Sequence, residues 1–126
     1  MHRSKLLNTA PIAYERSPQV LNSNNETRIQ LEKAAYEALN SRLAARWTDF
    51  WNDHPNSLSI LVDTAPIFNE ALDDPAKIGM KNATCEGDLL SGCVWADDFH
   101  PGPALHGWIA KHVADKASSS FPDFFA

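Results

Sequence analysis

The chain has 126 residues, an ordinary size for one domain, and its 44% hydrophobic and 21% charged content is typical of a globular protein. Its formal charge of −5 argues against a nucleic-acid or anionic-membrane partner, because phosphate binding needs a surplus of Lys and Arg. No apolar run approaches the ~18 residues of a membrane span, and no apolar segment of signal-peptide length follows the basic N-terminus.

Residues 4–10 (SKLLNTA) are predicted to form a buried strand, and the Pro-, Ser- and Asn-rich residues 11–25 are predicted to form a loop. A long helix is predicted over residues 27–52. Asn25 or Thr27 can cap its start, and Thr27 with Gln30 has the spacing of a capping box. One stripe of this helix is expected to be buried, at Leu31, Ala35, Ala38, Leu39, Arg42, Leu43, Trp47 and Phe50.

Residues 57–62 (SLSILV) form the second predicted strand, and their continuous apolar pattern is typical of a parallel sheet covered on both faces. The two strands end alike, in Asn-Thr-Ala-Pro-Ile from Asn8 and in Asp-Thr-Ala-Pro-Ile from Asp63. A β-α-β unit places both exits at the carboxyl edge of the sheet, where open α/β sheets bind ligands. A turn or capping role for Asp63 is favoured over a place in a cleft.

One or two short helices are predicted within residues 67–80, a loop around the cysteines over 81–99, and a last helix from Pro101 or Pro103 to Ala117. The side chains of this helix expected to face the sheet are Leu105, Trp108, Ile109, His112 and Val113. Residues 118–126 are expected to form a flexible tail. Two parallel strands leave both edges of a sheet unpaired, so the sequence predicts that further strands precede this segment.

Cys85 and Cys93 are the only cysteines and lie close together in a turn-rich stretch. A disulfide between them is favoured and would contribute about 2–3 kcal/mol by closing a short loop. Two free thiols in a reducing compartment are the alternative. Asn25 and Asn82 each begin an Asn-x-Thr glycosylation sequon. A disulfide and a glycan together would indicate a secreted protein whose export signal lies outside this sequence.

The strongest chemical signal is Asp97-x-x-His100, just before the last predicted helix. A turn can bring these side chains together, so that the carboxylate accepts the imidazole Nδ1–H and Nε2 takes a proton from a nucleophile. The spacing leaves a second interpretation open, in which Asp97 or Asp98 caps the helix and His100 is merely exposed. For Trp95 and Trp108, which flank this turn, packing against the sheet is favoured over lining a pocket.

Residues 94–112, in which Asp97-x-x-His100-Pro101 is followed by His106 and an amphipathic helix, resemble the last conserved block of the SGNH/GDSL hydrolase superfamily. The strand end at residues 7–12, residues 15–18, the long helix, the second strand and the cysteine pair match the secreted branch of that superfamily in order. This branch includes the acetyl esterases of carbohydrate esterase family 16. The resemblance implies that residues 1–117 are the C-terminal part of a flavodoxin-like α/β/α sandwich, with its last two parallel strands and their flanking helices.

The resemblance also implies Ser-His-Asp ester hydrolysis, with His100 as the general base and acid and Asp97 orienting it. The Gly-Asp-Ser nucleophile motif of the superfamily, and the Gly and Asn that help to bind the oxyanion, are absent from this sequence. The Gly-Asp pair at 87–88 is followed by leucine, and Ser91 is expected to be a turn residue. Without a nucleophile no acyl-enzyme can form, so this chain alone is expected to be inactive.

A fragment of a longer, extracellular ester hydrolase is therefore the favoured interpretation. Its substrate would be an acyl or acetyl ester, with acetylated carbohydrate as a candidate, and no cofactor is expected. The alternatives are a truncated pseudoenzyme and a non-catalytic interaction module that docks on a partner supplying the missing strands. A metal site is disfavoured because His100, His106 and His112 are six residues apart, and six helical steps turn successive rings about 120° from one another.

Overall fold

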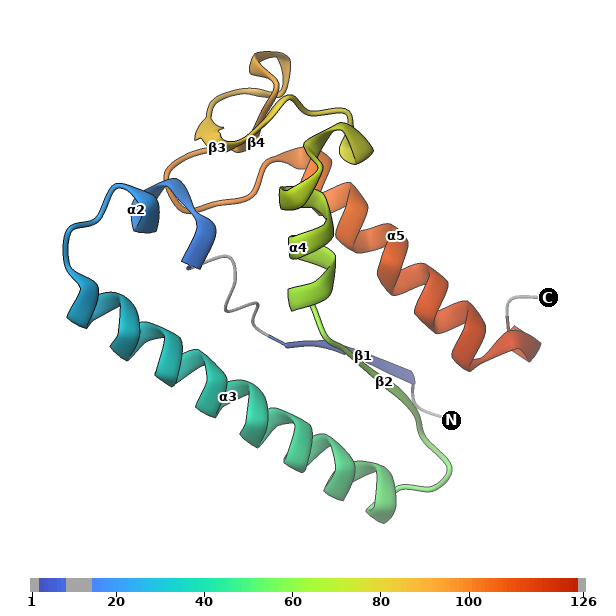
Figure 1. Ribbon diagram of the computed structural model, residues 1–126. Coiled ribbons are helices and arrows are strands. Elements are labelled where there is room, and N and C mark those ends of the chain that lie inside the picture. The colour runs from blue at the N-terminus through green and yellow to red at the C-terminus, as the bar shows by residue number, and fades with distance from the viewer. Residues whose placement is uncertain (1–2, 9–14, 125–126) are drawn as a thin grey trace.

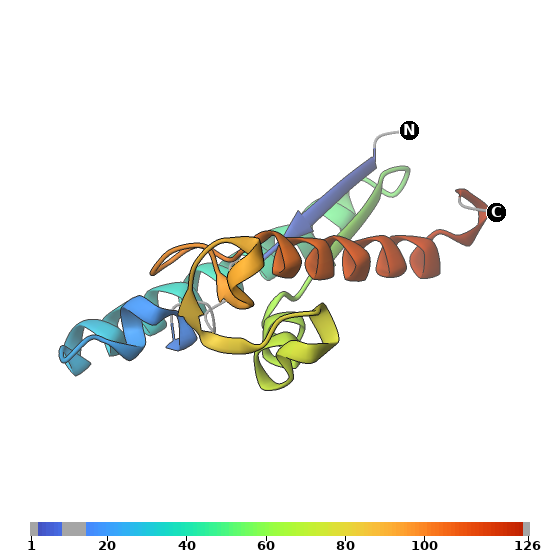
Figure 2. The ribbon, with the colours of Figure 1, turned by 90° about the horizontal axis from the view of Figure 1, so that it is seen from above.

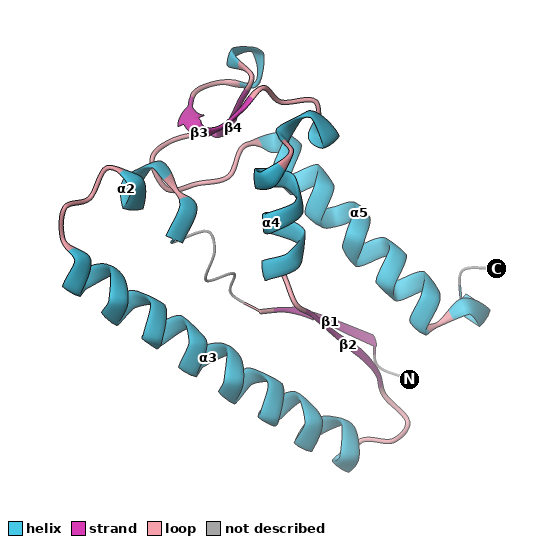
Figure 3. Ribbon diagram, viewed as in Figure 1, coloured by secondary structure: helices cyan, strands magenta, loops and turns pink. Residues whose placement is uncertain are grey.

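The computed structural model describes residues 3–8 and 15–124 (Figure 1). The strands β1 (Arg3–Leu7) and β2 (Leu58–Val62) form a parallel pair, with Leu7 opposite Val62. The long helix α3 (Glu26–Asp53) lies between them in the chain, which completes the predicted β-α-β unit and confirms an α/β fold (Figure 3). The first strand begins one residue earlier than predicted, and positions 9 and 10 of that prediction lie outside the described residues.

The two strand exits meet, as their matching sequences predict. Asn8 accepts the backbone N–H of Thr64 through Oδ1 at 2.8 Å, and its Nδ2 donates to Asp63 Oδ1 at 3.1 Å. Asp63 Oδ1 also accepts the N–H of Ala65 at 3.2 Å, so it has the turn-capping role favoured from the sequence. The rest of the first exit, residues 9–12, lies outside the described residues.

Helices cover both faces of β2. Ser59 faces α3, where its Oγ accepts the indole N–H of Trp47 at 2.8 Å. Alternate strand residues point to the opposite face, where α4 (Ala65–Asp73) and α5 (Pro103–Ser120) lie. The core cluster between β2 and these two helices contains Ile60, Val62, Ile67 and Ala117. A second cluster joins α4 and α5 to the strand before α5 and contains Phe68, Ala71, Leu72, Val94, Trp95 and Leu105. Figure 2 shows α4 and α5 side by side.

The bounds of α3 match the prediction to within one residue at each end. Asn25 is the N-cap, and its Oδ1 accepts the N–H of Arg28 at 3.0 Å. The capping box suggested for Thr27 and Gln30 does not form, because Gln30 Nε2 donates instead to Glu26 Oε1 at 2.7 Å. The helix thus begins where a side chain satisfies one of its unpaired N–H groups.

The predicted buried stripe of α3 is wrong for most of its length. Leu31 and Leu39 are 67% and 51% exposed, and the helix has no fully buried residue. Its half-buried apolar positions are Ile29, Tyr36, Leu43 and Trp47. Helical periodicity identifies an apolar face, but the strands beneath the helix decide which face is covered. The described sheet next to α3 has two strands, and the flank with Leu31 and Leu39 meets neither.

Short elements occupy two regions predicted as loops. Within residues 11–25 lies α2 (Pro18–Leu21), and within 81–99 the strands β3 (Asn82–Glu86) and β4 (Cys93–Trp95) form a second parallel pair. Among the described residues, short turns of 3₁₀ helix complete the order at Pro75–Ile78, Leu89–Ser91 and Pro122–Phe124. With three to five residues each, α2, β3 and β4 are too short to show a periodic pattern in the sequence.

Cys85 and Cys93 form a disulfide, which confirms the favoured alternative and joins β3 to β4. At the C-terminal end, α5 continues to Ser120, three residues past its predicted end. Ala117 is wholly buried and Phe121 packs against the same cluster, so the last turn is held by apolar contacts. In the part of the chain that the structure describes, no helix is both long and apolar enough to cross a lipid bilayer.

Candidate active site

The segment between β4 and α5 is a tight loop built on the core. Two backbone hydrogen bonds of 2.8 Å close it, one from Ala96 N–H to His100 O and one from Gly102 N–H to Val94 O. Trp95 at its base is wholly buried, and its indole N–H donates to a backbone carbonyl of β3 at 2.8 Å. The base of the loop is therefore fixed in the core, and most of the residues at its tip are exposed.

Asp97 and His100 lie at this tip and are paired. His100 Nδ1 lies 2.9 Å from Asp97 Oδ2 and 3.0 Å from Oδ1. Oδ1 also accepts the backbone N–H of Phe99 at 2.9 Å and that of His100 at 2.6 Å. When Nδ1–H donates to the carboxylate, Nε2 becomes the ring atom that can accept a proton.

The hydrogen bonds to Asp97 stabilise its ionised form. The backbone N–H of His100 contributes most, followed by the N–H of Phe99 and the His100 side chain, and they lower the pKa of Asp97 from 3.8 to about 2. The side chains of His100 and Asp97 are 69% and 55% exposed, so water can reach both. Asp97 therefore carries its charge throughout the neutral range, as a carboxylate that orients an imidazole must.

The helix-cap interpretation of the Asp-x-x-His spacing is wrong for α5. The N-cap of that helix is Gly102, beyond both Asp97 and Asp98. Asp97 instead caps its own turn through Oδ1, and both of its oxygens lie within hydrogen-bond distance of the imidazole Nδ1. A single carboxylate thus fixes both the backbone of the turn and the histidine ring.

A glycine is required where this loop joins α5. A Cβ at Gly102 would lie 2.9 Å from the carbonyl oxygen of Val94, a backbone atom that cannot swing aside. Gly102→Ala is therefore expected to destabilise the chain by about 1–3 kcal/mol, measured by urea unfolding. Gly107→Ala is the matched control, because a Cβ there meets nothing within 4 Å and alanine favours a helix interior by up to about 1 kcal/mol. Equal stability of the two variants would contradict this account of Gly102.

The elements bordering the paired side chains were not predicted as part of the site. Gln19 N–H, in α2, donates to Asp98 O at 2.8 Å, and α2 lies beside the loop that leads into α5 (Figure 1). The ring of Phe99 stands edge-on to His100, with 5.4 Å between centroids. A hollow of about 280 Å³ next to Phe99 is lined by Gln19, Arg28, Glu32, Tyr36 and Phe99. A partly polar recess thus lies next to Phe99, whose ring contacts His100.

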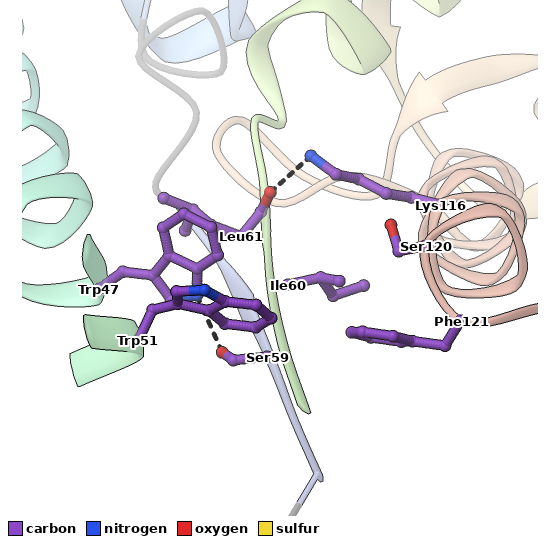
Figure 4. Close-up of a pocket in the computed structure, with 8 residues that line it drawn as sticks. All are labelled: Trp47, Trp51, Ser59, Ile60, Leu61, Lys116, Ser120 and Phe121. Atoms are coloured by element: carbon purple, nitrogen blue, oxygen red, sulfur yellow. Dashed lines mark hydrogen bonds between the residues drawn. The ribbon is translucent and has the colours of Figure 1, made fainter. Parts of the chain in front are cut away.

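A second hollow, of about 220 Å³, lies along β2 (Figure 4). Its lining residues are Trp47, Trp51, Ser59, Ile60, Leu61, Lys116, Ser120 and Phe121. Val62 O accepts the backbone N–H of Asn8, the residue after β1, so Leu61 O points away from β1. Lys116 Nζ donates to Leu61 O at 2.7 Å. A lysine on a strand edge opposes pairing with another strand. None of the lining residues is Asp, Glu or His, so this hollow offers no acid–base pair.

Ser91 and the two sequons have structural partners. Ser91 Oγ donates to Asp88 O at 2.6 Å, which is the expected turn role. Asn25 caps α3, and Asn82 Oδ1 accepts the hydroxyl of Thr84 at 2.9 Å. Both asparagines are exposed. Glycosylation at Asn25 or Asn82 stays a prediction.

The remaining aromatic and histidine candidates pack or face solvent. Trp95 is buried, and the indole N–H of Trp108 donates to Ile67 O at 3.2 Å, so both tryptophans have the packing role favoured from the sequence. His106 is exposed, and His112 lies edge-on to Trp108 with 4.6 Å between centroids. Among residues 3–8 and 15–124, no three His, Cys, Asp or Glu side chains gather as metal ligands would.

Comparison with known proteins gives one informative relationship. No protein-family model matches the chain. The chain is 35% identical to an acetylesterase of Thermothelomyces thermophilus over 116 residues, 92% of its length. The matched part is 38% of the length of that relative. Any 116-residue stretch of a 126-residue chain contains residues 11–116, so the match includes the loop with Asp97 and His100. The chain is thus related in sequence to an esterase.

Proposed function

We propose that this chain supplies the histidine and the aspartate of a Ser-His-Asp ester hydrolase. The pairing of His100 Nδ1 with Asp97 at 2.9 Å, at the exposed tip of a loop anchored in the core, is the observation that carries this proposal. The relationship to an acetylesterase gives it an independent basis. The aspartate role fits a carboxyl whose pKa is lowered to about 2.

In this mechanism His100 Nε2 takes the proton of a serine hydroxyl as the serine oxygen attacks the ester carbonyl carbon. The charge of Asp97 holds the Nδ1–H tautomer and stabilises the imidazolium that forms. Nε2–H then gives its proton to the departing alkoxide, and an acyl-serine remains. A water molecule, deprotonated in turn by Nε2, attacks the acyl carbon; the bond from that carbon to the serine oxygen breaks, Nε2–H returns its proton to the serine oxygen, and the acid is released.

The serine and the oxyanion donors come from sequence outside this chain. The chain covers 38% of the acetylesterase relative, so the remaining part of such a protein has room for a Gly-Asp-Ser block. On the resemblance to SGNH/GDSL hydrolases, β1 and β2 are the last strands of a larger flavodoxin-like parallel sheet. The chain alone is then inactive, because no nucleophile lies beside Nε2.

The proposed substrate is an acetyl ester, and on the resemblance to carbohydrate acetyl esterases its alcohol part is a sugar. The hollow beside Phe99 supports a hydroxylated alcohol, because Gln19, Arg28 and Glu32 offer both donors and acceptors. An extracellular location is proposed on the same resemblance. The Cys85–Cys93 disulfide supports it, since such bonds persist in oxidising compartments.

A hybrid protein tests the proposal. The stretch of the Thermothelomyces acetylesterase that matches this chain would be replaced by residues 1–126, and turnover of 4-nitrophenyl acetate would be measured. The hybrid is expected to hydrolyse the ester, whereas this chain alone is expected to show only the uncatalysed rate. A hybrid that melts cooperatively like the relative but shows no turnover would refute the proposal.

A further inference from the structure

The turn that carries the Asp97–His100 pair is held from outside by one backbone group. Gln19 N–H donates to the carbonyl oxygen of Asp98 at 2.8 Å. Gln19 is the second residue of α2, and first-turn N–H groups of a helix have no partner within the helix. This N–H is therefore available to the neighbouring loop.

The peptide unit between Asp98 and Phe99 links this hydrogen bond to the aspartate. The unit is planar, with its C=O and N–H on opposite sides. On one side Asp98 O accepts from Gln19, and on the other side Phe99 N–H donates to Asp97 Oδ1 at 2.9 Å. Hydrogen bonds arranged in such a chain polarise one another, and together they fix the plane of the peptide.

The segment that presents Gln19 N–H is itself anchored to the body of the fold. Arg16 Nη1 donates to Asn69 Oδ1 at 3.1 Å and to Asp73 Oδ1 at 2.7 Å, both on α4. Ser17 is wholly buried and is the N-cap of α2. Because α4 packs in the same core cluster as Trp95, the base of the loop and α2 share one rigid support.

We propose that the backbone N–H of Gln19 is a positioning group for the Asp97–His100 pair, acting through the Asp98–Phe99 peptide unit. It holds Phe99 N–H towards Asp97 Oδ1, which fixes the carboxylate with its two oxygens facing His100 Nδ1. The catalytic consequence rests on the proposed esterase function, while the effect on Asp97 itself does not. No side chain of Gln19 is needed for this role.

Gln19→Pro and Gln19→Ala form the test pair, since proline deletes the N–H and alanine keeps it. Proline is compatible with a first helical turn. In the 126-residue chain, Gln19→Pro is expected to raise the pKa of Asp97 from about 2 towards 3.8, followed by carbon NMR of the carboxyl. It is also expected to lower the fraction of His100 in the Nδ1–H tautomer, followed by ¹⁵N shifts. Gln19→Ala is expected to keep the wild-type values of both.

Wild-type values of both quantities in a folded Gln19→Pro variant would overturn the proposal. Proline also restrains the residue before it, here Pro18, so the amide spectrum must first show that the variant is folded. If it is not, Arg16→Met provides the second measurement, because it loosens the anchor on α4 while leaving the backbone of α2 intact. Arg16→Met is expected to raise the pKa of Asp97 in the same direction, and an unchanged value would overturn the proposal as well.

Activity in the hybrid protein separates this inference from the proposed function. Compared with Gln19→Ala, which also lacks the glutamine side chain, Gln19→Pro is expected to lower kcat roughly tenfold with little difference in KM, because a misplaced base slows the chemical step more than binding. Suppose that the wild-type hybrid is inactive, but that Gln19→Pro still changes the pKa of Asp97 and the tautomer of His100 in the 126-residue chain. That result would remove the esterase function and keep the positioning role. An active hybrid in which Gln19→Pro changes neither kcat nor the NMR values would keep the esterase function and remove the positioning role.

Discussion

Replacing His100 with alanine in the hybrid protein is expected to lower kcat by roughly 10⁴-fold or more, equivalent to about 5 kcal/mol of transition-state stabilisation. The imidazole is the only group proposed to move protons in both halves of the reaction, so both formation and hydrolysis of the acyl-serine are expected to slow. Initial rates with 4-nitrophenyl acetate at saturating substrate give this comparison. KM is expected to change little, because the ring acts on the reacting atoms and not on the ground-state ester.

Loss of folding would not explain such a result. The side chain of His100 is 69% exposed, and the backbone bond from Ala96 N–H to His100 O does not depend on the ring. His100→Ala is therefore expected to unfold within about 1 kcal/mol of the wild type. His106→Ala is the matched control, since His106 is an exposed histidine of the same sequence block and is expected to leave kcat unchanged. Undiminished turnover in His100→Ala would remove His100 from the mechanism.

The sequence predicted the parts of the fold that are long or carry a distinctive pattern. The bounds of α3 were predicted to within one residue, and β2 followed from one continuous apolar run. The covered face of α3 could not be obtained in this way. Leu31 and Leu39 belong to an apolar stripe, but they are exposed, because tertiary packing and not periodicity decides which face of a helix a sheet covers.

The sequence pointed to the two paired side chains of the candidate site but not to the backbone group that supports their turn. Asp97 and His100 were proposed from their spacing together with the resemblance to the SGNH/GDSL superfamily, and the structure pairs them through a turn that this spacing allows. Gln19 was missed because a backbone N–H leaves no trace in an amino-acid sequence. The start of α2 had a signal, since Ser17-Pro18 is the N-cap and first-turn proline of a helix. The position of α2 beside Asp98 depends on tertiary packing, which the local sequence does not show.

Asp97→Asn is expected to lower kcat in the hybrid protein by about 10⁴-fold, for a reason visible in the turn. The amide oxygen of the asparagine would take the place of Oδ1, where it accepts the N–H groups of Phe99 and His100. The amide NH₂ would then face Nδ1 of His100 and donate to it. The ring proton would move to Nε2, the atom that must accept a proton from serine.

The tautomer itself is measurable, and ¹⁵N NMR of the 126-residue chain should show His100 shifting from Nδ1–H to Nε2–H in Asp97→Asn. Asp98→Asn is the matched control, because its side chain does not contact the ring in any described bond, and it is expected to keep both the tautomer and kcat. A folded Asp97→Asn variant with wild-type kcat would show that the carboxylate does not orient the imidazole.

The same substitution has an expected pH signature in folding stability. Folding lowers the pKa of Asp97 from 3.8 to about 2, so its ionised form stabilises the native chain. That contribution is fully present above pH 3.8 and is lost as the pH falls through about 2. Asp97→Asn lacks it at every pH. The free energies of unfolding of the two proteins are therefore expected to differ at neutral pH and to converge as the pH approaches 2. A difference that stays constant over this range would mean that the turn, and not the charge of the carboxylate, accounts for the stability that Asp97 provides.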